Sequence, residues 1–138
     1  MNDKSGFWDD AEIVSTYTRA QAIEDGVLVD LRQGDLEEVV QNAGLKYPVA
    51  CTAEVFAECV NLTGAAKRAG NDMKGRLWDV LWMLKMAIRR AQRSTDRISF
   101  TVRIVRDRVR PTPTELVAVC GPGDNAEPSI TIMFPGQN

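Results

Sequence analysis

Arginine is the residue type in this sequence that most clearly suggests chemistry. The candidates within the arginine-rich segment, residues 89–110, are Arg89, Arg90, Arg93, Arg103, Arg106, Arg108 and Arg110. The guanidinium group is a planar fork of donors that suits carboxylate and phosphate groups. Positive charge at a helix end also complements the helix dipole, which is a sufficient structural cause for the first three. The last four have no such cause, so the segment predicts an anionic partner.

Familiar catalytic groups are missing, because the chain contains no histidine. This removes the commonest general base, the Ser/His and Cys/His nucleophile pairs and the usual nitrogen ligand of zinc. Cys51, Cys59 and Cys120 form no CxxC pair and lie in apolar stretches, so we expect reduced thiols in the core. Adjacent carboxylates such as Asp9 and Asp10 point in different directions and do not indicate a catalytic pair. The sequence therefore predicts a protein that is not an enzyme and uses no metal or cofactor.

The loop Cys120-Gly121-Pro122-Gly123-Asp124 is glycine-rich and suggests an anion site at first. It lacks the spacing of a P-loop or of a dinucleotide fingerprint, and no lysine or helix start follows it. We therefore expect a turn between two strands.

Charge is unevenly distributed along the chain. Residues 1–66 carry 12 acidic and 4 basic residues, residues 67–110 carry 13 basic and 4 acidic ones, and residues 111–138 carry 3 acidic ones and no basic one. Two interpretations stand equally: the molecule has an acidic side and a basic side, or the two segments fold together and neutralise each other. The sequence pI near 5.2 counts against a nucleic-acid-binding domain.

Trp8 lies in an N-terminal arm, residues 1–17, with Asp9 and Asp10 beside it. A tryptophan in such a polar setting either anchors an interface or pins the arm to the domain. An acidic arm can imitate phosphate, while the arginine-rich segment pairs with acidic groups of a target. Trp8, Asp9 and Asp10 therefore join the arginines as candidates for partner binding.

One long helix should position these groups, and its signal runs from Asp72 to Arg93. Apolar residues recur there at spacings of three and four, at Met73, Leu77, Val80, Leu81, Leu84, Ile88 and Ala91. Trp78, Trp82 and Met86 follow at i, i+4 and i+8 on an adjoining face, so the apolar arc is wider than one contact requires. Either shorter helices cover this arc or a homodimer forms through it.

Three short helices are predicted before the long one. Their N-caps are Thr18, Asp35 (with Glu38 at the capping-box spacing) and Thr52. Gly26 and Gly44 end the first two helices. A brief strand at 27–31 should be buried on both faces, and 47–49 reads as an extended link.

After the long helix the apolar period changes to two, which indicates strands at 98–105, 116–120 and 130–134. The prediction is a single α+β domain over 1–138. It has the arm at 1–17, a mostly helical part at 18–93, and strands at 97–135 that form a three-stranded antiparallel meander, with room for one extra short strand. The long helix should lie across one face of that sheet.

The N-terminus has no export signal, and the longest apolar segment, 77–88, is interrupted by Asp79 and Lys85. We expect a cytoplasmic protein with no membrane contact.

Several blocks together resemble a family of small uncharacterised proteins carried by phages, plasmids and other mobile elements. The blocks are residues 26–30 (GVLVD), 47–50 (YPVA) with Thr52, 76–81 (RLWDVL) with Met83 and Leu84, and 118–124 (AVCGPGD) with Pro128, 130–133 (ITIM) and Pro135. The resemblance implies no reaction and no catalytic residue. It implies a genomic setting in which small accessory proteins often disarm host defence.

Together these observations predict a non-enzymatic binding protein of a mobile element, an inhibitor of a host defence complex of the anti-CRISPR or anti-restriction type that acts by occluding a surface. The alternative is a nucleotide- or nucleic-acid-binding module that uses the arginine-rich segment.

Overall fold

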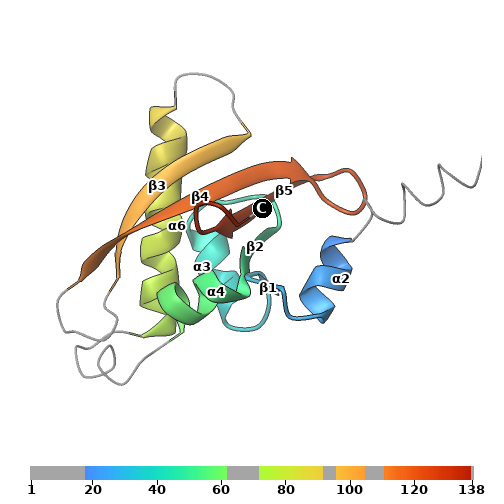
Figure 1. Cartoon of the computed structure of the whole chain (residues 1–138), viewed down its shortest axis with the longest axis horizontal. Coiled ribbons are helices and arrows are strands. Elements are labelled where there is room, and N and C mark those ends of the chain that lie inside the picture. The colour runs from blue at the N-terminus through green and yellow to red at the C-terminus, as the bar shows by residue number, and fades with distance from the viewer. Residues whose placement is uncertain (1–17, 62–71, 92–95, 105–110, 138) are drawn as a thin grey trace, which may run out of the picture.

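Five strands form one mixed sheet in a computed structural model of the chain, which describes residues 18–61, 72–91, 96–104 and 111–137. The strands are β1 (Leu28–Asp30), β2 (Val49–Thr52), β3 (Arg97–Ile104), β4 (Thr112–Pro122) and β5 (Pro128–Met133). Their order across the sheet is β1-β2-β5-β4-β3 (Figure 1). β3, β4 and β5 pair antiparallel, as the predicted meander requires, whereas β5 pairs parallel to β2. The last strand of the chain is therefore the middle strand of the sheet.

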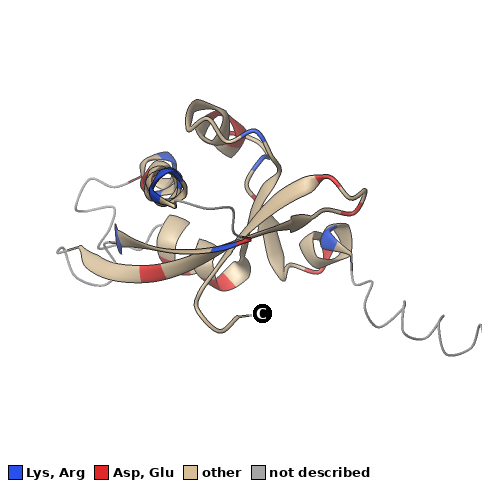
Figure 2. Ribbon diagram, turned by 90° about the horizontal axis from the view of Figure 1, so that it is seen from above, with Lys and Arg blue, Asp and Glu red and all other residues tan. Residues whose placement is uncertain are grey.

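One long helix and several short helical elements accompany the sheet. They are α2 (Arg19–Glu24), α3 (Leu36–Asn42), α4 (Ala53–Val55), the π-helical turn η1 (Phe56–Val60) and α6 (Met73–Arg90). Figure 2 shows α6 and α3 on one side of the sheet and the C-terminal end of the chain on the other. The fold class is α+β, as predicted.

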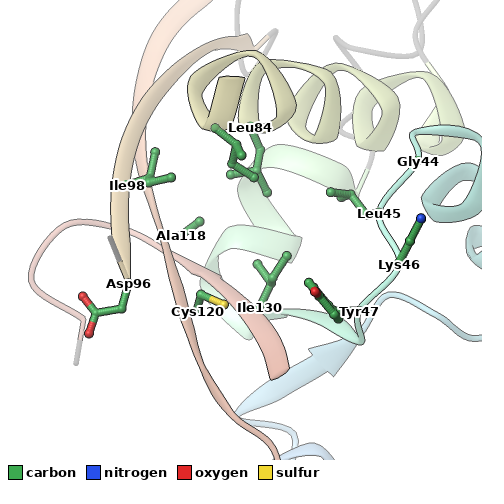
Figure 3. A pocket seen from close by; sticks show the side chains of 11 residues that line it. Gly44, Leu45, Lys46, Tyr47, Leu84, Asp96, Ile98, Ala118, Cys120 and Ile130 are labelled. Carbon is green, nitrogen blue, oxygen red and sulfur yellow. The ribbon is translucent and has the colours of Figure 1, made fainter. Parts of the chain in front are cut away.

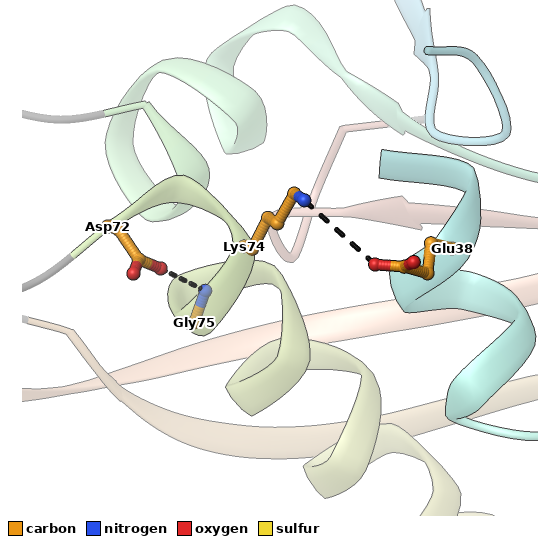
Figure 4. Close-up of polar contacts among 4 residues, drawn as sticks. All are labelled: Glu38, Asp72, Lys74 and Gly75. Atoms are coloured by element: carbon orange, nitrogen blue, oxygen red, sulfur yellow. Dashed lines mark hydrogen bonds and ion pairs between the residues drawn. The ribbon is translucent and has the colours of Figure 1, made fainter. Parts of the chain in front are cut away.

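The long helix α6 begins at a side-chain cap. The Oδ1 atom of Asp72 accepts a hydrogen bond from the backbone N–H of Gly75 at 2.6 Å (Figure 4). Leu77, Leu81 and Leu84 are fully buried on its sheet-facing side, which confirms the predicted apolar stripe. Each such side chain contributes about 1.5–3 kcal/mol of burial free energy, so this stripe anchors α6 to the core. The helix ends at Arg90, because Ala91 adopts an extended conformation.

The sheet presents different residues on its two faces. Along β3, Phe100, Val102 and Ile104 are buried and alternate with exposed polar residues, so the inward set meets α6. On the opposite face, the C-terminal segment returns to the sheet: the hydroxyl of Thr52 and the backbone N–H of Phe134 both donate to Oε1 of Gln137, at 2.9 and 2.8 Å. The C-terminal segment thereby covers part of the opposite face.

One strand of the sheet, β2, lies where no strand was predicted. β2 occupies the region predicted as an extended link and the start of a helix, and all four of its residues are buried. A four-residue apolar run has no period that separates strand from helix, and the cap signal of Thr52 overlapped the end of the strand. β1 is an edge strand paired to β2 alone and is only half-buried, not buried on both faces. The sheet thus gains two short strands rather than one.

The predicted helix caps form where the backbone of the capping residue has the required conformation. The hydroxyl of Thr18 accepts from the backbone N–H of Gln21 at 3.0 Å, and that of Thr52 accepts from Val55. Asp35 makes no side-chain cap, because its backbone is already helical and its carboxylate cannot turn back to the first amides. Gly26 and Gly44, at φ +80° and +82°, end α2 and α3 in the left-handed region as predicted.

Candidate interaction surface

The candidate partner-binding residues fall into two groups. Trp8, Asp9, Asp10, Arg93, Arg106, Arg108 and Arg110 lie outside the described residues. Arg89 and Arg90 are exposed in the last turn of α6, and Arg103 is exposed on β3. The described part of the arginine-rich segment therefore presents its guanidinium groups to solvent.

These arginines do not converge on one patch. Arg103 shares a hollow with Asp79 and Trp82, whereas Arg89 lies ten residues further along α6, about 15 Å along the helix axis. The cause is the short connection after α6, which sends β3 back antiparallel to the helix. Charge is likewise interspersed: Figure 2 shows blue and red segments mixed over the described elements rather than separated on two sides.

Two tryptophans form the most unusual surface feature among the described residues. Trp78 and Trp82 are 36% and 40% exposed, and their rings stack with centroids 5.6 Å apart and planes 19° apart. The ammonium of Lys85 lies 5.9 Å from the centroid of the Trp82 ring, within cation–π range. The spacings of four and three residues place all three on one side of α6, adjoining the buried face of Leu77 and Leu84. We call Trp78, Trp82, Lys85 and Arg89 the α6 outer face.

The sequence predicted this excess of apolar surface, and none of the described elements covers it. Met86, the third residue of the predicted adjoining face, is partly exposed. Ile88 was predicted to lie in the core but is 40% exposed, because the sheet has diverged from the helix at this end and leaves a cavity. A stacked, exposed aromatic pair on a helix surface is more typical of a docking site than of a surface that contacts only solvent.

A hollow of about 440 Å³ adjoins the α6 outer face. Asp79, Trp82 and Met83 line it from α6, and Thr101 and Arg103 line it from β3. Partial burial raises the pKa of the Asp79 carboxyl above its usual range. The hollow offers a partner one carboxyl group, one guanidinium group and apolar walls within one groove.

The glycine-rich loop contacts the start of α2. Both carboxylate oxygens of Asp124 accept from the first amides of α2, Oδ1 from Arg19 at 2.8 Å and Oδ2 from Ala20 at 3.0 Å. The Arg19 guanidinium in turn donates to Oγ1 of Thr131 and to the carbonyl of Ile130 on β5. Burial lowers the pKa of Arg19, while Asp30, Asp124 and Glu127 oppose that shift. Sequence spacing could not reveal this cap, because 105 residues separate its partners.

Arg76 is a buried cation that sequence reasoning missed. It is 3% exposed on α6, and its guanidinium donates to the carbonyls of Cys59 at 3.0 Å and Glu58 at 2.6 Å. These carbonyls end η1, where a positive charge also complements the local dipole. Nearby, Lys74 and Glu38 form an exposed ion pair between α6 and α3, with Nζ and Oε1 3.9 Å apart (Figure 4). Both contacts join α6 to neighbouring helices.

The cysteines differ from one another more than predicted. Cys51 and Cys59 are buried, and burial raises the pKa of the Cys51 thiol to about 12. Cys120 is exposed, which corrects the expectation of a core thiol, because it lies near the end of β4 and lines the open cavity between the C-terminal half of α6 and the sheet. Within the described ranges, no group of three or more cysteine and acidic residues is placed to hold a metal ion. None of the helices described there has the length and apolarity that crossing a membrane requires.

The full chain, residues 1–138, matches a protein family described as a family of unknown function, DUF6573. The chain belongs to this family. A search of curated proteins and a search of solved structures found no match. Membership in DUF6573 agrees with the resemblance to an uncharacterised family and assigns no reaction to the α6 outer face.

Proposed function

We propose that this protein is a non-enzymatic binding domain that docks on a partner protein through the α6 outer face. The observation that carries the proposal is the stacked, exposed pair of Trp78 and Trp82. Tryptophan and arginine are the residue types most enriched at the energetic centres of protein interfaces, and here Arg89 and Arg103 flank the pair. The sheet packs on the other side of α6, and among the described residues the aromatic pair stays exposed.

The partner's surface should be apolar at its centre and acidic at its edge. Lys85 and Arg89 give the α6 outer face a positive rim, with Arg103 across the adjoining hollow. A second copy of the chain would bring the same cations against each other, which opposes the homodimer through Trp78, Trp82 and Met86 that the sequence allows. We therefore favour a different protein as the occupant.

The class of partner proposed is a nucleic-acid-processing host defence complex, of the CRISPR or restriction type, which the domain would inhibit by occluding a surface. The support for this class is the resemblance to proteins of mobile elements. The direct test is binding and inhibition across a representative panel of such complexes. Wild type should bind at least one, whereas Trp82→Ala should bind about 30-fold more weakly, the loss typical of a hot-spot residue.

A matched control comes from Val27, which is 51% exposed on the far side of the molecule near α2. Val27→Ala should bind like wild type. Failure of the whole panel would overturn the defence-inhibitor proposal, and equal binding by Trp82→Ala would remove the α6 outer face from it. A dimer in sedimentation that Trp82→Ala dissociates would show that a second copy occupies the face.

The alternative function is nucleic-acid binding through Arg89, Arg90, Arg103 and the aromatic pair, since bases stack on tryptophan. Arg103 lies beside Asp79, and Arg89 is about 15 Å further along the α6 axis than Asp79, so a single phosphate patch is disfavoured. Fluorescence anisotropy with short RNA and DNA would identify this function by binding that weakens steeply as salt rises.

A further inference from the structure

An apolar cavity of about 340 Å³ lies between the C-terminal half of α6 and the sheet (Figure 3). Leu84 and Ile88 form its roof, and Ile98, Ala118 and Ile130 of the three antiparallel strands form its floor. Leu45 and Tyr47, from the connection between α3 and β2, close the remaining side. This volume is within the range of small-molecule sites, about 300–1,000 Å³, and the walls are mostly aliphatic. The cavity opens on the sheet side of the helix and shares only Lys85 with the α6 outer face.

One end of the cavity carries positive charge. Lys46 lines it next to Gly44, and a Cβ atom placed on Gly44 would lie 2.8 Å from the Nζ atom of Lys85. The Lys85 ammonium therefore lies directly over the Gly44 backbone at this edge. Figure 3 shows the amine of Lys46 beside Gly44 and the carboxylate of Asp96 on the opposite side of the cavity. The two ends of the cavity thus differ in charge.

Apolar walls with cations at one end fit a ligand of matching polarity. A hydrocarbon body would gain by leaving water for the aliphatic walls, and a carboxylate would gain charge-assisted hydrogen bonds from ammonium groups. A neutral apolar molecule would leave the cations without a counter-charge. A hydrophobic amine would be repelled at that end and would find only the Asp96 carboxylate at the other, so two cations against one carboxylate favour an anionic ligand. We propose that this cavity binds a hydrophobic monocarboxylate, with its chain against Leu84, Ile98 and Ile130 and its carboxylate toward Lys46 and Lys85.

The chain supplies its own reporter for this site, because the exposed Cys120 thiol lines the cavity. The other two thiols are buried, and the Cys51 pKa of about 12 keeps that group protonated at pH 8. The rate of modification by a disulfide reagent at pH 8 therefore reports Cys120. We expect decanoate, below its micellar concentration, to slow this modification at least fivefold. Decanol should protect more weakly, and decyltrimethylammonium should not protect.

Variants distinguish binding of decanoate in the cavity from non-specific detergent effects of decanoate on the protein. Ala118→Leu fills the cavity from a buried position, and Ile88→Glu places a negative charge at its exposed rim; either should abolish protection by decanoate. Lys46→Gln should weaken decanoate binding about tenfold and leave decanol unchanged. Lys74→Gln, a cation change elsewhere on α6, should bind like wild type. Circular dichroism and melting curves establish that each variant is folded.

The proposal is overturned if decanoate does not protect Cys120 in wild type, or if it protects Ala118→Leu and Ile88→Glu equally well. Equal protection by decanoate and decanol, unchanged in Lys46→Gln, would overturn the carboxylate assignment. The test does not involve Trp82 or any partner protein, so its outcome is independent of the function proposed above.

Discussion

Replacing Arg76 by methionine should destabilise the fold by about 2–4 kcal/mol. Arg76 is 3% exposed, and its guanidinium donates to two backbone carbonyls near the end of η1, at 2.6 and 3.0 Å. Methionine fills a similar volume and keeps helix propensity, so the change isolates the polar contacts.

Two effects of opposite sign determine that magnitude. Each hydrogen bond to a charged group contributes about 1.5–3 kcal/mol, so losing two costs about 3–6 kcal/mol. Removing a buried cation also removes its desolvation penalty, which returns part of this cost. The return is incomplete, because the carbonyls of Glu58 and Cys59 belong to the backbone and stay in place. Arg76→Lys keeps the charge with one compact donor group and should fall between wild type and Arg76→Met.

Urea unfolding monitored by tryptophan fluorescence measures this difference, with Lys74→Met as the matched control. Lys74 is two residues away on α6 and exposed, and its 3.9 Å ion pair with Glu38 should contribute less than about 1 kcal/mol. An unfolding free energy for Arg76→Met within 0.5 kcal/mol of that control, at an unchanged slope, would refute the assigned role of the guanidinium.

Three further predictions concern other sites. The Cys51 thiol has an ordinary pKa of 9.0 in the unfolded chain and a pKa of about 12 in the folded state. The protonated thiol therefore contributes fully to stability below pH 9, and this contribution is lost as the pH rises toward 12. Unfolding free energies measured from pH 8 to 11 should therefore fall more steeply in wild type than in Cys51→Ala, by up to about 1.4 kcal/mol per pH unit; parallel curves would contradict this. Asp124→Ala should cost about 1–2 kcal/mol and speed amide exchange in α2 at Ala20, while α3 stays protected; unchanged exchange there would exclude the cap. Gly26→Ala should cost about 1 kcal/mol by thermal unfolding, since its φ of +80° is strained for alanine although the space around it is open; no loss would mean that the turn relaxes.

The candidate surface was partly visible in the sequence. The spacing of Trp78, Trp82 and Met86 predicts an apolar arc on α6 that is too wide for one packed element to cover. In the structure both tryptophans are partly exposed. The sequence shows that arginines are frequent in this segment but not how they are arranged in space, because that arrangement depends on the direction of β3 relative to α6. The apolar cavity had no signal at all, since its walls come from α6, three strands and a loop.

The sequence by itself determined what depends on neighbouring residues: the α6 stripe, the caps at Thr18, Thr52 and Asp72, and the alternation along β3. These features arise from hydrogen bonds and periodicities that act within a few residues of each other. Only the tertiary structure decided which strands are neighbours. The parallel pairing of β2 with β5, the Asp124 cap on α2 and the burial of Arg76 each join segments 17 to 105 residues apart. Such contacts form because the whole core excludes water, and no local pattern encodes them.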